Sequence, residues 1–263
     1  MGSSEARSPC GRQPVKFTNK VAIVTGASQG IGKAVSLAFI TEGASVAICA
    51  RDKARLDEAA EQIGAGVFSM PCDVSSEGEV RSFVQQVQRR FGKIDILVNN
   101  AGDTSSALLL EMDSLFWNRT LANNLTSVFL MTRAVIPAMM QQKYGRVVNV
   151  ASMAAKHGSR YISAYSATKH GVLGFTRSVA LEMVDHGITV NAVCPGYVDT
   201  LNQERNIETI MRDRRLPHEE VRKMLEQKNP RRRFISMEEV AQTILLLASD
   251  EAGAITGEAV DLW

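Results

Sequence analysis

The sequence has few of the residues that characterise metal-binding or disulfide-rich proteins. Only four cysteines and four histidines occur among its 263 residues. Cys10, Cys49, Cys72 and Cys194 form neither a Cys-x-x-Cys pair nor the spacing of a zinc site, and we expect no metal. Three of the cysteines lie in or beside strand-like runs, so we expect buried, reduced thiols. Reduced thiols indicate a cytoplasmic location.

Long apolar runs and a large net charge are also missing. No stretch reaches the roughly 18 apolar residues of a membrane span. The 30 basic and 28 acidic residues leave a formal net charge of +2, and no basic cluster is interleaved with aromatic residues. The composition therefore argues against a nucleic-acid partner and against a membrane partner.

What is present fits one globular domain. Hydrophobic residues make up 45% of the chain, and strand-like runs alternate with amphipathic helical patterns. The alternation predicts an α/β fold, a doubly wound parallel sheet in a single domain over residues 19–263. Residues 1–18 show no periodicity and lack the apolar core of a secretory signal. We expect them to be a disordered extension; a native segment, a targeting segment and an artificially added one are the open alternatives.

Three groups suited to carbonyl chemistry lie in one short stretch. Lys169 follows Tyr165 by four residues, and Ser152 precedes Tyr165 by thirteen. If the chain is helical from about Ser163, Tyr165 and Lys169 share a face, and the ammonium would lower the pKa of the phenol. Ser152 ends a strand-like run and could hold a substrate oxygen. Taken alone, the pair could also be two unrelated surface residues.

Residues 20–52 read as strand, glycine turn, helix and second strand. Gly26, Gly30 and Gly32 separate a short apolar run from a helical pattern. Such a turn lets backbone N–H groups approach a pyrophosphate, with the following helix directing its positive end at the charge. A tight structural turn without a ligand is the alternative.

Arg51 lies where the second strand ends. A carboxylate at this point would accept from the ribose 2′-hydroxyl of NAD, whereas an arginine can neutralise the 2′-phosphate of NADP. The sequence therefore favours NADP(H) as cofactor. Two observations oppose this preference: Asp52 is the next residue, and Arg51 could simply lie on a solvated turn.

Several short motifs occur together in a fixed order. They are TGASQGIG at 25–32, CDV at 72–74, NNAG at 99–102, NNL at 123–125, Ser152, Tyr165, Lys169 and PGYVDT at 195–200. Over residues 20–261 the chain resembles the short-chain dehydrogenase/reductase family. The resemblance implies a Rossmann fold and a homo-oligomer, either tetramer or dimer.

The resemblance also implies roles for individual residues. Asn124, Ser152, Tyr165 and Lys169 would form a catalytic tetrad, and Asn99 would help to line the cofactor cleft. The residues expected to bind the cofactor are Gly26, Ser28, Gln29, Gly30, Ile31, Gly32, Arg51, Asp73, Val74, Asn100, Ala101, Gly102, Tyr165, Lys169, Pro195, Gly196, Val198 and Thr200.

Within the family, the chain looks most similar to β-oxoacyl-thioester reductases and polyketide ketoreductases. The resemblance thus implies hydride transfer between NADP(H) and a ketone or secondary alcohol. An NAD-dependent 3-hydroxybutyrate or 3-hydroxyacyl dehydrogenase is an alternative, as is a reductase of steroid or sugar ketones. A non-catalytic NADP-binding scaffold or sensor is an alternative of another class, but the intact tetrad argues against it.

Residues 201–233 follow the last motif and have an unusual composition. They contain ten basic and six acidic residues. We expect this segment to act as a substrate lid, whose basic side chains could meet an anionic group such as the phosphates of coenzyme A or of an acyl-carrier arm. A helix with a solvated charged face would show the same composition.

Overall fold

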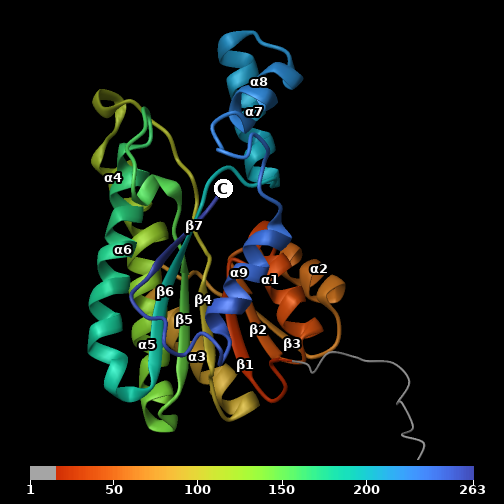
Figure 1. Ribbon diagram of the computed structural model, residues 1–263, viewed down its shortest axis with the longest axis vertical. Coiled ribbons are helices and arrows are strands. Elements are labelled where there is room, and N and C mark those ends of the chain that lie inside the picture. Colours follow the sequence, from red (N-terminus) through yellow and green to blue (C-terminus); the bar gives the residue numbers. More distant parts are fainter. Residues whose placement is uncertain (1–15) are drawn as a thin grey trace, which may run out of the picture.

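A seven-stranded parallel sheet forms the centre of the protein (Figure 1). The computed structural model describes residues 16–263. The strands follow the order β3-β2-β1-β4-β5-β6-β7. They are β1 (Val21–Thr25), β2 (Ser45–Ala50), β3 (Val67–Pro71), β4 (Ile96–Asn99), β5 (Gly145–Val150), β6 (Ile188–Pro195) and β7 (Ala259–Leu262). The order reverses direction between β1 and β4, which confirms the predicted doubly wound fold.

Helices cover both faces of the sheet (Figure 1). One face carries α1 (Gly30–Thr41), α2 (Lys53–Ile63) and α9 (Met237–Ala248). The other carries α3 (Glu77–Phe91), α5 (Ser127–Gln142) and α6 (Ser163–Met183). Shorter elements are α4 (Ser114–Leu121), the π-turn Ala122–Thr126 and the 3₁₀ turns Leu109–Glu111, Met153–Ala155 and Val184–His186.

Strand β1 shows how the sequence fills both layers. All of its residues are buried, as expected for a strand covered on both faces. Ala22 and Val24 pack in the layer that contains α1 and α9, whereas Val21 and Ile23 pack in the layer that contains α3 and α5. Successive side chains of a strand point to opposite faces, so one short apolar run contributes to both cores.

The N-terminal boundary of the domain needs a correction. Residues 1–15, most of the predicted extension, lie outside the described residues. Phe17 was assigned to the extension, yet its side chain is 1% exposed and meets the Phe39 ring edge-to-face at 5.0 Å. Its backbone N–H donates to the carbonyl of Glu42 at 2.9 Å. The sequence around Phe17 shows neither helix nor strand periodicity, so it did not predict that this residue would be buried.

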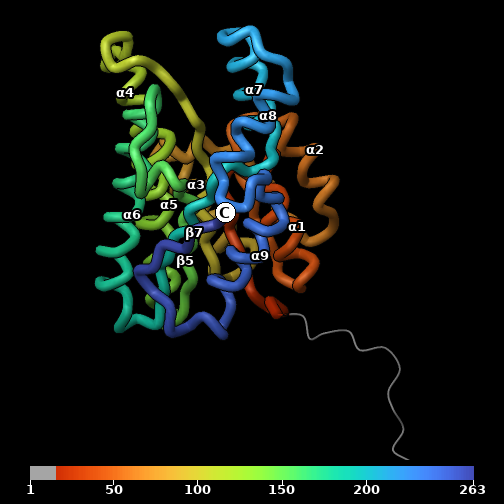
Figure 2. The backbone as a smooth tube through the Cα atoms, turned by 45° about the horizontal axis from the view of Figure 1, so that its top comes forward, coloured from red at the N-terminus to blue at the C-terminus, as the bar shows by residue number. Residues whose placement is uncertain are grey.

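Residues 201–233 form a small helical unit above the carboxyl ends of the strands (Figures 1 and 2). It consists of α7 (Leu201–Arg214), α8 (His218–Glu226) and the loop that follows. Ile207, Val221, Leu225 and Phe234 form an apolar cluster of their own between these elements. The unit therefore has a core that is separate from the two layers of the main sheet.

Within the part of the chain that the structure describes, none of the helices combines the length and the apolarity that crossing a membrane requires.

Removal of the Phe17 side chain tests the corrected boundary. Phe17→Ala should lower the free energy of unfolding by about 3 kcal/mol, because it leaves a cavity against Phe39. Urea unfolding measures the effect. Leu110→Ala serves as the control, since Leu110 is 98% exposed and its truncation should change stability by less than about 0.5 kcal/mol. Equal, small effects of both substitutions would contradict the boundary.

Candidate active site

The glycine turn between β1 and α1 has no space for a side chain at two of its glycines, Gly26 and Gly32. Gly26 has φ of +64°, and a Cβ there would lie 2.7 Å from the Cα of Ala101. A Cβ on Gly32 would lie 2.5 Å from the carbonyl oxygen of Gly26. The first turn of α1 has no side-chain cap from Gln29. A helix start without such a cap leaves N–H groups that an anion could approach.

Asn100 and Thr25 hold this turn against the end of β4. The Asn100 Nδ2 donates to the carbonyls of Thr25 at 2.9 Å and Gly26 at 3.1 Å. Thr25 Oγ1 in turn accepts from the backbone N–H groups of Asn100 and Ala101, both at 3.0 Å. Asn99 does not line the cleft, contrary to expectation: it is buried, and its amide donates to Thr132 and Asn149.

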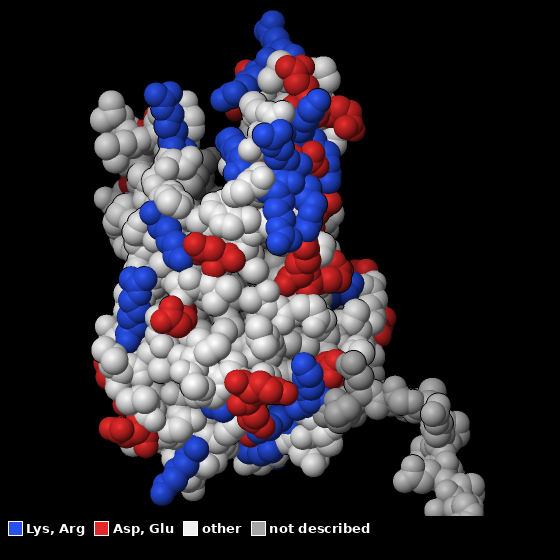
Figure 3. Space-filling model, in the orientation of Figure 1, with Lys and Arg blue, Asp and Glu red and all other residues white. Residues whose placement is uncertain are grey.

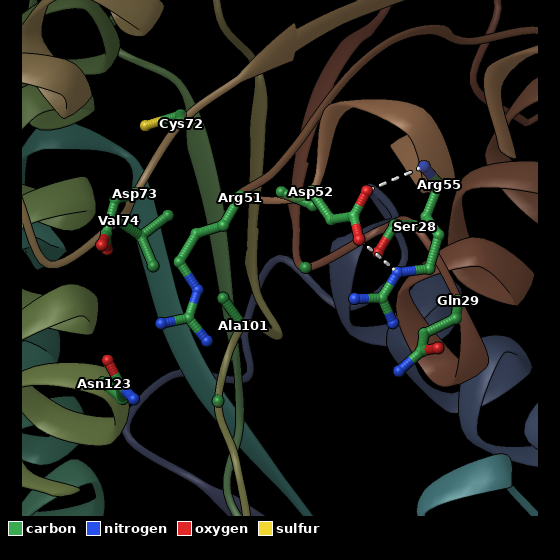
Figure 4. A pocket seen from close by; sticks show the side chains of 13 residues that line it. Ser28, Gln29, Arg51, Asp52, Arg55, Cys72, Asp73, Val74, Ala101 and Asn123 are labelled. Carbon is green, nitrogen blue, oxygen red and sulfur yellow. Dashed lines mark hydrogen bonds and ion pairs between the residues drawn. The ribbon is translucent and has the colours of Figure 1, made fainter. Parts of the chain in front are cut away.

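A cavity lies beside the turn, where the order of the strands reverses (Figure 4). Ligands of doubly wound folds bind at this position. The cavity is lined by Gly26, Ser28, Gln29, Ala50, Arg51, Asp52, Arg55, Cys72, Asp73, Val74, Ala101, Gly102 and Asn123. Eight of the predicted cofactor residues are among them. The buried, free thiol of Cys72, like those of Cys49 and Cys194, also agrees with the sequence prediction.

Two arginines line the cavity. Figure 4 shows Arg51 extending between Ala101 and Asn123. Arg55, in the first turn of α2, binds Asp52 through Nε at 2.6 Å, and Asp52 also accepts from the Arg55 N–H at 3.1 Å. Both bonds lower the pKa of Asp52, and the bond from the Arg55 backbone N–H has the larger effect. The acid that argued against NADP is thus paired with a second cation of the cavity.

Sequence reasoning missed Arg55. Its only signal was its distance of four residues from Arg51, which carries meaning once a helix is known to begin at Lys53. Asn123 was also missed, although it belongs to a motif that was recognised.

Asp73 is held in place at the far side of the cavity. Its Oδ1 accepts from the N–H of Ser75 at 2.9 Å and from its hydroxyl at 2.7 Å. Burial opposes ionisation, but the bonds from Ser75 and the charge of Arg51 lower the pKa of Asp73. The carboxylate therefore stays ionised near Arg51.

Tyr165 and Lys169 share one face of α6, which begins at Ser163 as predicted. The Lys169 Nζ lies 5.6 Å from the centre of the Tyr165 ring. It donates to the carbonyl of Val150, the last residue of β5, at 2.8 Å. The helix and the end of β5 are thus joined through the ammonium group.

The expected lowering of the Tyr165 pKa is wrong for this structure. Burial raises the pKa of Tyr165, and hydrogen bonds from Ser152 and Thr104 only partly oppose this effect. Lys169 is 5% exposed, and burial lowers its pKa to about 8. Desolvation acts on both groups and disfavours their charged forms, so the uncharged phenol is favoured over the phenolate.

Ser152 follows β5 and is fixed by its own turn. Its Oγ accepts from the N–H of Ala154 at 3.1 Å. The hydroxyl proton therefore remains free to be donated elsewhere. A side-chain hydrogen bond between Ser152 and Tyr165 brings the hydroxyl and the phenol together.

Asn124 lies in the π-turn between α4 and α5, where the Ser127 N–H donates to the carbonyl of Ala122. The π-turn therefore lies within a continuous helical run from Ser114 to Gln142, and such turns are frequent at functional sites. Asn124 is fully buried. A Cβ on Gly102 would lie 2.7 Å from Asn124 Oδ1 and 3.8 Å from Lys169 Nζ, so Gly102 connects the cavity to the tyrosine–lysine pair.

The remaining predicted cofactor residues lie outside the lining of the cavity. Gly30 and Ile31 start α1, and Pro195 ends β6. Thr200, the N-cap of α7, approaches the glycine turn: its Cγ2 would lie 4.0 Å from a Cβ on Gly30. Gly196 and Val198 lie between β6 and α7. In residues 16–263, no group of three or more His, Cys, Asp or Glu side chains could hold a metal ion.

Comparison with known proteins decides the family. The model of the short chain dehydrogenase family matches residues 20–210. The chain belongs to this family. It is 38% identical to a 3-oxoacyl-[acyl-carrier-protein] reductase of Thermotoga maritima over 94% of this chain and 98% of that protein. It is 37% identical to a D-beta-hydroxybutyrate dehydrogenase of Rhizobium meliloti, with 92% and 96% coverage.

A solved structure agrees with this assignment. A variant of the actinorhodin polyketide ketoreductase, crystallised with NADPH, superposes with a TM-score of 0.90 at 36% identity, covering 94% of this chain and 97% of that one. The chain is thus a short-chain dehydrogenase, an oxidoreductase close to the ketoacyl reductases.

The buried Lys169 should reduce the stability of this short-chain dehydrogenase. Its pKa falls from 10.5 to about 8 on folding. Below that value both states are protonated and the whole penalty applies; between the two values the unfolded chain binds more protons, so stability rises with pH. Lys169→Met should therefore raise the free energy of unfolding at pH 7, by about 1–2 kcal/mol once the lost bond to Val150 is allowed for.

Urea unfolding at several pH values measures this difference. The advantage of the variant should shrink as the pH rises from 8 toward 10.5. A variant that is less stable at pH 7 would show that the bond to Val150 outweighs desolvation.

Proposed function

We propose that the chain is an NADP(H)-dependent ketoreductase whose substrate is a 3-oxoacyl thioester or a related ketone. The observation that carries the proposal is the position of Ser152, Tyr165 and Lys169 next to a cavity with a glycine cradle and two arginines. A binding scaffold would need the cradle but not the buried, destabilising lysine.

The cavity fits a phosphorylated dinucleotide. A pyrophosphate would lie against the uncapped N–H groups of α1, and Asp73 and Val74, which line the cavity, would border the adenine. Arg51 and Arg55 could both bind a 2′-phosphate, since guanidinium groups match phosphate geometry. When bound, the cofactor supplies the hydride; the protein positions it and the ketone.

The side chains would activate the ketone in a simple way. Tyr165, favoured in its protonated form, donates its proton to the carbonyl oxygen as charge develops there. Ser152, which donates its hydroxyl proton to Tyr165 in this structure, would donate it to the same oxygen when a ketone is bound. Lys169, held by Val150, has a pKa near working pH and can replace the proton of the tyrosine, with Asn124 beside it. These four residues are the proposed tetrad.

The helical unit of residues 201–233 is the proposed substrate lid. Lys and Arg side chains gather on it in Figure 3, interspersed with acidic ones. Arg222 and Arg233 are paired with acids. Lys223 and Arg232 form no ion pair within residues 16–263, and they line a second, shallow cavity. We propose that they meet the phosphates of a coenzyme A or acyl-carrier substrate.

Assembly and location complete the proposal. Large apolar side chains are exposed on α4, α5 and α6, among them Leu115, Phe129 and Leu181. They support a homo-oligomer, a tetramer or a dimer, formed through these helices. The buried free thiols of Cys49, Cys72 and Cys194 support a reducing compartment, which we propose to be the cytoplasm.

Tyr165→Phe tests the acid. Loss of the phenolic proton should lower kcat for ketone reduction between about 100- and 10,000-fold. Binding of NADPH, followed by fluorescence titration, should change little. A variant that retains most of its turnover would remove Tyr165 from the proposed role.

Arg51→Ala and Arg55→Ala test the cofactor preference. Each should raise KM for NADPH about tenfold or more, the effect of losing a charged hydrogen bond, and leave KM for NADH nearly unchanged. Lys53→Ala is the matched control, because Lys53 is paired with Asp57 and does not line the cavity. Equal effects on both cofactors would contradict binding of a 2′-phosphate.

Acetoacetyl-coenzyme A and a plain ketone of similar size separate the substrate classes. Lys223→Gln with Arg232→Gln should raise KM for the thioester about fivefold and spare the plain ketone, since only the thioester carries phosphates. Arg89→Gln with Lys143→Gln, which removes two exposed positive charges outside residues 201–233, is the control matched in net charge. If the parent protein oxidises 3-hydroxybutyrate with NAD instead, the dehydrogenase alternative replaces the proposal.

A further inference from the structure

Asp103 directly follows the NNAG motif and lies beside the proposed tetrad. Its carboxylate accepts three side-chain hydrogen bonds, from Asn123 Nδ2 at 2.9 Å, Asn124 Nδ2 at 3.2 Å and Ser105 Oγ at 3.3 Å. Neither the proposed cofactor site nor the tetrad includes this residue. Asp103 is half-buried and exchanges hydrogen bonds with Asn124, a member of the proposed tetrad. These contacts suggest a role in the active site in addition to holding the loop.

Asp103 binds both ends of the Asn124 amide. Its backbone N–H donates to Asn124 Oδ1 at 3.1 Å, while its carboxylate accepts from Asn124 Nδ2. The carbonyl of Thr120 accepts from the same Nδ2 at 3.1 Å. The buried amide can therefore adopt only one orientation, because a flipped amide would face Asp103 N–H with a donor.

The charge of Asp103 also reaches the tyrosine–lysine pair. It favours the protonated form of both Tyr165 and Lys169, so it acts in the same direction on both. Lys169 also faces the Tyr165 ring, the Val150 carbonyl and the thiol of Cys194 from β6. Tyr165 also faces Ser152 and Thr104. Asp103 is a carboxylate whose charge acts on both members of the pair.

We propose that Asp103 is a positioning residue of this active site: it fixes the orientation of Asn124 and places a negative charge beside the tyrosine–lysine pair that would give a proton to a carbonyl oxygen. The proposal rests on the proposed function of the site. It predicts that the neutral residue Asn at this position shifts the enzyme toward alcohol oxidation, which needs the phenolate.

The first test follows the protonation of Lys169 directly and needs no turnover. Nuclear magnetic resonance of protein with isotope-labelled lysine reports each ammonium, and Lys169 is identified by the signal that Lys169→Arg lacks. Its midpoint in the parent should lie near 8. Asp103→Asn should move the midpoint to lower pH, because an attractive charge has been removed. A midpoint that does not move overturns the proposal.

Three further variants separate charge from folding. Asp103→Glu keeps the charge and should leave the Lys169 midpoint closer to that of the parent than Asp103→Asn does. Asp103→Ser is a second neutral variant, in case Asp103→Asn folds poorly. Glu111→Gln removes the same unit of charge from an exposed position of the neighbouring 3₁₀ turn and should leave the midpoint unchanged. An equal shift in Glu111→Gln would mean that net charge, not Asp103, is responsible.

The second test uses pH–rate profiles of ketone reduction and alcohol oxidation. In Asp103→Asn, the alkaline limb of reduction and the acid limb of oxidation should both move to lower pH, since Tyr165 would lose its proton more readily. A loss of rate without any movement of the limbs would indicate a purely structural role and overturn the proposal. If the parent protein reduces no ketone, the proposed function fails, whereas the Lys169 titration still decides the role of Asp103.

Discussion

The site depends on the close approach of two backbone segments at the point where the sheet reverses its order. The turn after β1 touches residues 100–102 after β4, with Gly26 and Ala101 so near that a single Cβ would force them apart. Thr25 and Asn100 fasten this contact by hydrogen bonds. Gly102 extends the contact to Asn124 and Lys169. The cavity and the tyrosine–lysine pair are therefore positioned by one piece of packing, and not independently.

Charge is distributed unevenly around this contact. The cations that would meet a phosphate, Arg51 and Arg55, are exposed, where ionisation costs little. Lys169 is buried, and desolvation lowers its pKa to about 8, which disfavours the folded chain below that pH. Two features offset part of the penalty: the carbonyl of Val150 accepts from the ammonium, and Asp103 places a negative charge nearby. A group that titrates near neutral pH is the result, as proton transfer requires.

The sequence predicted those features that rest on local pattern. The change of period across the glycines located the turn, and the spacing of Tyr165 and Lys169 located a helix face. Features that rest on tertiary contacts could not be seen. Asp103 has no partner in its own segment except Ser105, and its main contacts lie some twenty residues away. The amino-acid composition of residues 122–126 does not predict a π-turn. The burial of Phe17 could not be predicted either, because it depends on Phe39 in α1.

The helical unit of residues 201–233, which we propose as a lid, packs around its own core and not around the residues that form the site. Ile207, Val221, Leu225 and Phe234 give it a core of its own, and the isolated bridge between Val198 and Ile235 joins its two ends to each other. Thr200 is the point where it approaches the glycine turn. Changes on the outer faces of α7 and α8 therefore leave the packing around Gly26 and Gly102 intact. If the unit contacts the substrate as proposed, substrate contacts and catalytic geometry rest on separate cores, an arrangement that lets one site serve different substrates.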